Sequence, residues 1–142
     1  ALDEVQHTRL AFDLASAYAA FPVGPGLFAL TDAMPSLTPG DILHSLIDEA
    51  CVTETLGIAK LYEQAESESD PVVAGILRRL ARDETRHAAL AWRALRWILG
   101  EYPELLPEAR AQLSTLLARA QYRQNPAVDE VIRPIVAAVL AG

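Results

Sequence analysis

The sequence predicts an all-α protein, and three observations support this. Apolar residues make up 51% of the chain, and Ala and Leu dominate over runs of β-branched residues. Apolar side chains recur at helical spacing over long stretches. Clusters of Pro and Gly separate these stretches. The 142 residues are enough for one core, so we expect a single antiparallel helical bundle over 1–142.

The first helix is predicted from residue 1 to about 21, where Pro22 ends it. Residues 22–40 are rich in Pro and Gly and form a connection, whose length suits a long crossover between two helical hairpins. Thr38 or Asp41 is the expected cap of the next helix. Apolar side chains should pin the connection to the bundle: Phe28, Leu30, Met34 and Leu37.

Two long helices follow, over 41–66 and 71–99, and the short polar turn between them makes them antiparallel. Pro71 stands at the first position of the second helix, and Gly100 is expected to close it. Two C-terminal helices, 103–121 and 126–140, carry no acid or His on their apolar faces. We interpret them as accessory packing elements.

Charge and cysteine content restrict the class of protein. The net charge of −7 argues against a nucleic-acid surface, and the arginines between Arg78 and Arg96 read as a solvated face with ion pairs. A single cysteine, Cys51, fits a reducing compartment and a small buried side chain. Without a signal-peptide pattern or a long apolar run, we expect a cytoplasmic protein with no membrane partner.

The strongest chemical signal is a Glu-x-x-His pair in the helix over 71–99. Glu84 and His87 share one helix face, and that face is otherwise apolar: Leu77, Leu80, Ala88, Ala91 and Leu95. A buried carboxylate needs a compensating partner. A metal ion and a hydrogen-bonded pair both satisfy this requirement.

A second copy of the pattern favours the metal. Glu4 and His7 stand in the same frame near the start of the chain, so two of the three histidines follow a Glu at this spacing. Carboxylate oxygens and imidazole nitrogens suit iron or manganese. Two such pairs suit a two-metal centre inside a helical bundle. The remaining histidine, His44, lies on a polar side and is expected at the surface.

The helix over 41–66 should add one carboxylate, and Glu49 and Glu54 are the candidates. On an α-helical wheel Glu54 lies at the centre of the apolar stripe, whereas the face around Glu49 is half polar. Counting from the turn also puts Glu54 level with Glu84. We therefore predict Glu54 as the ligand, with Glu49 as the alternative.

Three segments together resemble the ferritin-like superfamily, and more narrowly its bacterial ferritin-like domain proteins: Ala1–Ala11, Glu49–Leu56 and Asp83–Arg93. The tRNA-modifying di-iron hydroxylases and rubrerythrins are more distantly similar. The resemblance covers residues 1 to about 99. It implies that Glu4 and Glu84 bridge two metal ions, that His7 and His87 each bind one, and that Glu54 is a terminal ligand. The family's Glu from an earlier helix has no counterpart here.

The resemblance implies a non-haem di-iron, or manganese–iron, carboxylate protein, an oxidoreductase that activates dioxygen or peroxide. The alternative is a structural or interaction bundle with a vestigial or empty metal site. A third reading is iron storage in a cage. The first Glu-x-x-His lies within the opening turns of the sequence, so we expect either that the first helix is missing from an N-terminally incomplete chain or that another polypeptide supplies it. A homodimer, or the C-terminal helices, would then cover the open apolar side; we favour the dimer.

Overall fold

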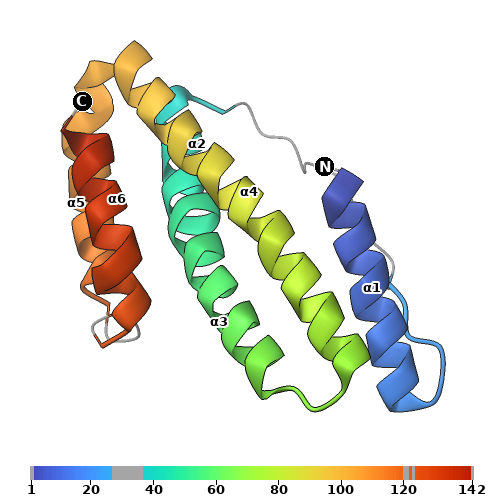
Figure 1. The fold of residues 1–142 in the computed structure, drawn as a ribbon. Coiled ribbons are helices and arrows are strands. Elements are labelled where there is room, and N and C mark those ends of the chain that lie inside the picture. The colour runs from blue at the N-terminus through green and yellow to red at the C-terminus, as the bar shows by residue number, and fades with distance from the viewer. Residues whose placement is uncertain (1, 27–36, 120–121, 123, 142) are drawn as a thin grey trace. The chain divides into compact units, whose positions relative to one another are not determined.

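The structure is a computed structural model that describes residues 2–26, 37–119, 122 and 124–141. All elements in these residues are helical (Figure 1), which confirms the all-α prediction. The chain divides into two compact units, Ala1–Ser36 and Leu37–Gly142. We describe each unit by itself, and the single domain over 1–142 stays a prediction. None of the described helices is long and apolar enough to cross a membrane.

The first unit contains α1 (Leu2–Ala19), close to the predicted span. The helix stops at Ala20, whose φ of 59° is left-handed and breaks the α-helical path. Beyond it the Val23 amide donates a 2.8 Å hydrogen bond back to Ser16 Oγ. None of the residues of α1 is fully buried. Phe28, Leu30 and Met34, predicted to pin the connection, lie outside the described residues, and Leu37 is exposed.

The second unit opens with one long helical rod in three parts: α2 (Pro39–Ser45), the π-helix η1 (Leu46–Thr53) and α3 (Glu54–Ser67). Thr38 caps its start, because Thr38 Oγ1 accepts from the Asp41 amide and the Asp41 carboxylate accepts from the Thr38 amide. This capping box confirms the predicted start. The π-helical stretch was not predicted.

The second long helix is α4 (Pro71–Glu101), and Figure 1 shows it antiparallel to α3. Asp70 caps it by accepting from the Val72 amide at 2.7 Å. The prediction that Gly100 closes this helix is wrong. The helix runs through Gly100, and it ends because Pro103 disfavours the α conformation at Tyr102, where φ is −128°.

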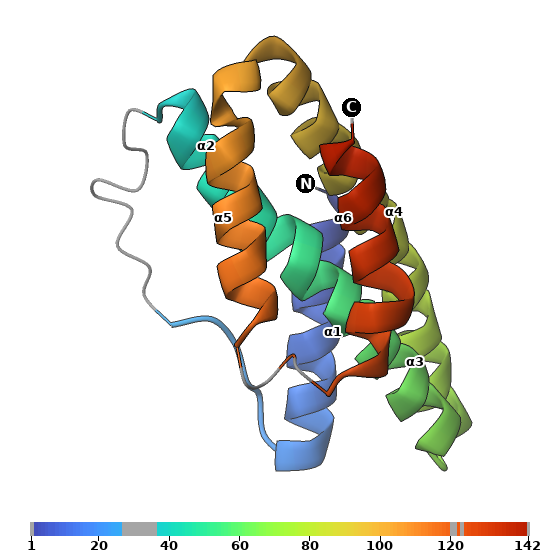
Figure 2. The same ribbon diagram turned by 90° about the vertical axis from the view of Figure 1, so that its left-hand side faces the viewer.

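The C-terminal part packs against the rod of α2, η1 and α3 and against α4. It contains the 3₁₀-helix η2 (Pro103–Leu105), α5 (Leu106–Leu117), the π-helix η3 (Val128–Ile132) and α6 (Arg133–Leu140). Figure 2 shows α5 and α6 side by side. Both carry packing residues, as predicted, and the shared core lies where they meet η1 and α4: Leu43, Ile47, Val52, Trp92, Leu95, Leu113, Leu116, Val128 and Ile132.

Candidate metal centre

Glu84 and His87 lie one turn apart on α4 and contact each other. Glu84 Oε2 is 3.2 Å from His87 Nδ1. The next residues on this stripe, Ala88 and Ala91, are buried and small. The structure thus places a carboxylate and an imidazole together beside the apolar face of α4, as the spacing predicts.

Asp83, the acidic neighbour of Glu84, belongs to a different face. Its carboxylate lies 2.6 Å from Arg86 Nη2 and 4.0 Å from Arg79 Nε. These are the helix ion pairs that the arginine-rich face predicts. Asp83 is therefore paired with arginines, whereas its neighbour Glu84 contacts His87.

The N-terminal pair repeats the geometry within its own unit. Glu4 Oε2 lies 3.7 Å from His7 Nδ1, and the two residues share a face of α1. In the same turn Thr8 Oγ1 donates to the Glu4 carbonyl at 2.8 Å. Each Glu-x-x-His motif therefore places two possible metal-ligand side chains next to each other on its own helix.

Glu54 stands where the π-helix ends. Its amide donates to the Glu49 carbonyl, which closes a turn over five residues. On an α-helical wheel these two acids are about 140° apart, but a turn that closes over five residues brings them toward one side. Glu54 still differs from Glu49 in burial, since Glu54 Oε2 is buried and Glu49 is exposed. The preference for Glu54 stays a prediction.

Side-chain contacts fix the register of α3 against α4. Trp92 Nε1 donates to Thr55 Oγ1 at 3.1 Å, and Arg78 Nη2 donates to the Ala65 carbonyl at 3.3 Å. Trp92 lies eight residues beyond Glu84 on α4, or about 12 Å along the helix axis, and its ring leans back toward the N-terminal side of α4. The level of Glu54 relative to Glu84 stays a prediction.

Two further candidate residues have structural surroundings. His44 is exposed, as predicted, and its Nε2 lies 2.6 Å from Glu108 Oε1 on α5. Cys51 is fully buried in η1, and burial raises the pKa of its thiol to about 12, with a further contribution from the Glu54 charge. The thiol is therefore protonated at neutral pH, as expected of a packing residue.

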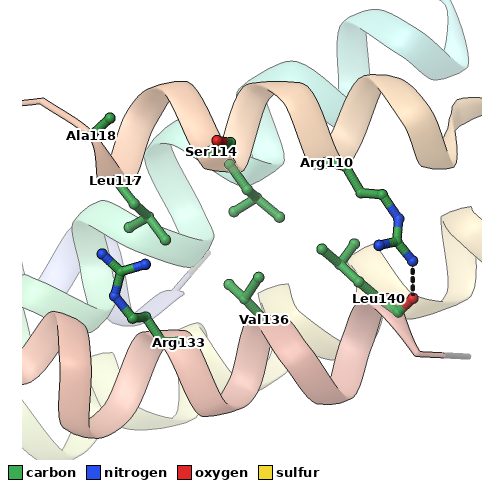
Figure 3. A pocket seen from close by; sticks show the side chains of 8 residues that line it. Arg110, Ser114, Leu117, Ala118, Arg133, Val136 and Leu140 are labelled. Atoms are coloured by element: carbon green, nitrogen blue, oxygen red, sulfur yellow. Dashed lines mark hydrogen bonds between the residues drawn. The ribbon is translucent and has the colours of Figure 1, made fainter.

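A surface cavity of about 450 Å³ lies between α5 and α6, far along the chain from both Glu-x-x-His pairs (Figure 3). Its floor is apolar, with Leu117 and Val136 facing it, and an arginine stands at each end. Arg110 donates to the Leu140 carbonyl at 2.8 Å, and Arg133 Nε lies 2.7 Å from Asp129. Both guanidinium groups therefore have intramolecular partners that stabilise α6.

Comparison with known proteins gives no relative: no family model, curated protein or solved structure matches the chain. The interpretation of the site depends on its own chemistry. Two carboxylates and two imidazoles, arranged as Glu-x-x-His pairs, form the nitrogen and oxygen donor set that suits iron and manganese. The residues present fit a divalent metal ion.

Proposed function

We propose that this protein binds divalent transition metal, iron or a manganese–iron combination, through its two Glu-x-x-His pairs. The observation that carries the proposal is the repetition of the Glu-x-x-His pair on two helices: Glu84 and His87 lie 3.2 Å apart beside an apolar stripe, and Glu4 and His7 lie 3.7 Å apart. Isolated Glu–His contacts are common on helices. The same spacing on two different helices favours a shared role.

The proposal extends to a centre with two ions, to which both pairs contribute. The residues that would hold these ions are Glu4, His7, Glu54, Glu84 and His87, with Glu4 and Glu84 shared between the two ions and one histidine for each. The π-helix that ends at Glu54 supports its inclusion, because such irregular turns are frequent at functional sites. The ferritin-like resemblance belongs to the same proposal.

Bound iron would supply redox chemistry with dioxygen or peroxide, so the proposed class is an oxidoreductase. The chain's own residues would hold the ions by charge and exclude water. Ala88, Ala91 and Leu95 place an apolar surface along the stripe next to Glu84 and His87. Such surroundings strengthen the attraction between carboxylates and a cation.

Metal titration of the purified chain tests this function. We expect anaerobic Fe²⁺ titration, followed by elemental analysis after desalting, to give up to two ions per chain. Glu84→Gln and His87→Ala should each lower this value. Glu63→Ala and His44→Ala are matched controls, since both replace exposed residues outside the proposed ligand set. Retention of iron that is equal in all four variants would contradict the proposal.

A second candidate function is an interaction bundle with an empty site. It is favoured by the 3.2 Å contact itself, because Glu84 and His87 already satisfy each other without a cation. The same titration separates the two. An interaction bundle retains no iron after desalting, and its thermal stability is unchanged by Fe²⁺ or Mn²⁺.

We also propose that the chain forms a homodimer. Several large apolar side chains of the first unit are strongly exposed: Leu2 at 80%, Tyr18 at 75% and Phe21 at 62%. A second copy is an economical cover for such a surface. Light scattering should give twice the chain mass, and Tyr18→Lys with Phe21→Lys should shift it to the monomer. A monomer at micromolar concentration in the unchanged chain would refute the dimer.

A further inference from the structure

A second cavity, of about 390 Å³, lies within the Leu37–Gly142 unit, and its chemistry differs from that of the other sites. Four helical segments form its walls: α3 contributes Ile58, α4 contributes Ala88, η3 contributes Val131, and α6 contributes Ile135. We propose that this cavity binds the hydrocarbon chain of a small amphiphile. This proposal does not depend on bound metal.

The lining offers a ligand no unpaired side-chain N–H or O–H donor. Trp92 Nε1 already donates to Thr55 Oγ1, and Thr55 Oγ1 donates to the Cys51 carbonyl at 2.6 Å. The third polar group, Thr85 Oγ1, donates to the Ala81 carbonyl at 2.7 Å. All three are paired inside the protein, and the remaining walls are aliphatic or aromatic. A ligand must therefore gain its binding energy from apolar contact.

The size of the cavity, about 390 Å³, suits a small molecule. Small ligands occupy cavities of about 300–1,000 Å³. The volume fits a medium-length hydrocarbon chain, with any polar head left in solvent.

Irregular helical turns border the cavity on two sides. Val131 belongs to the π-helix η3, and Thr55 is the second residue after the π-helix η1. Each π-turn re-aims the residues that follow it. Small side chains then leave the space open, among them Ala59 and Ala89 at the rim. Larger residues at these two positions would fill the cavity from its exposed edge.

Trp92 makes the proposal directly testable, because its ring lines the cavity. Trp97 is 63% exposed and does not line it, so Trp97→Phe leaves one tryptophan as a reporter. The probe is bromodecanol, whose bromine quenches indole fluorescence on contact. We expect saturable quenching of Trp92 in the Trp97→Phe chain, with one probe per protein.

Filling the cavity should weaken probe binding. Ala89→Phe and Ala59→Phe should each weaken probe binding by about tenfold or more, which corresponds to contact with about two methylene groups. Ala118→Phe is the matched control, because Ala118 lines the α5–α6 cavity of Figure 3. Circular dichroism should confirm that all variants are folded. Absent or non-saturable quenching, or equal binding in the filled and control variants, would overturn the proposal.

Discussion

Trp92 and Thr55, which are 37 residues apart, join the two long helices by one buried hydrogen bond, with Trp92 Nε1 3.1 Å from Thr55 Oγ1. Thr55 is the single buried polar residue among the described positions, at 8% exposure. Its hydroxyl accepts from the indole and donates to the Cys51 carbonyl. One hydroxyl thus links α4 to α3 and to the end of η1.

Replacing this hydroxyl should destabilise the fold. Thr55→Val leaves the Trp92 N–H buried without an acceptor, which costs about 1–3 kcal/mol. Urea unfolding followed by circular dichroism measures this loss. Thr53→Val is the matched control, because Thr53 Oγ1 also donates to a backbone carbonyl, that of Asp48, but is exposed. Equal losses in the two variants would show that the indole contact adds nothing.

The capping box at the start of α2 predicts a second stability effect. Thr38 Oγ1 accepts from the Asp41 amide, and Asp41 accepts from the Thr38 amide at 2.8 Å. Thr38→Ala should cost about 0.5–2 kcal/mol of unfolding free energy. Thr38→Ser keeps the hydroxyl and should restore most of the stability. A Ser variant as unstable as the Ala variant would contradict the capping role.

The same contact gives a pH dependence. Hydrogen bonds from the Thr38 side chain and amide lower the pKa of Asp41 below its ordinary value of 3.8. A carboxyl whose folded pKa is lowered stabilises the fold fully above the unfolded pKa, and this contribution is lost as the pH falls through the folded pKa. Unfolding free energy should therefore fall on acidification below about pH 4. Asp41→Asn should show a shallower fall than the unchanged chain.

Much of the fold was predictable because its boundaries depend on local chemistry. Thr38 with Asp41 marks a helix start in any context, and Pro71 marks another. The predicted end of the helix at Gly100 was wrong, because glycine permits a left-handed turn without requiring one. The π-helix η1 left no sequence signal, because bonds that skip five residues demand no particular side chain.

The candidate site was likewise predictable only where it depends on the spacing of residues within one helix. The pairing of Glu84 with His87 follows from their spacing on α4 alone. The register of α3 depends on how Thr55 meets Trp92, and no pattern within either helix encodes this contact. For that reason the sequence predicted the local Glu–His pairs but not the contact of Thr55 with Trp92 or the apolar cavity that both residues line.

The final prediction concerns which acid of the central rod binds metal. Glu54 has a buried Oε2 and directly follows η1, whereas Glu49 is exposed one π-turn earlier. Glu54→Ala should therefore lower the iron stoichiometry, and Glu49→Ala should leave it nearly unchanged. Because the π-turn brings both acids toward one side, the main alternative is that Glu49 and Glu54 both bind the metal. Elemental analysis of the two variants and of Glu49→Ala/Glu54→Ala decides it: equal loss in both single variants means that two carboxylates of this rod bind the metal, and that the α-helical wheel chose wrongly.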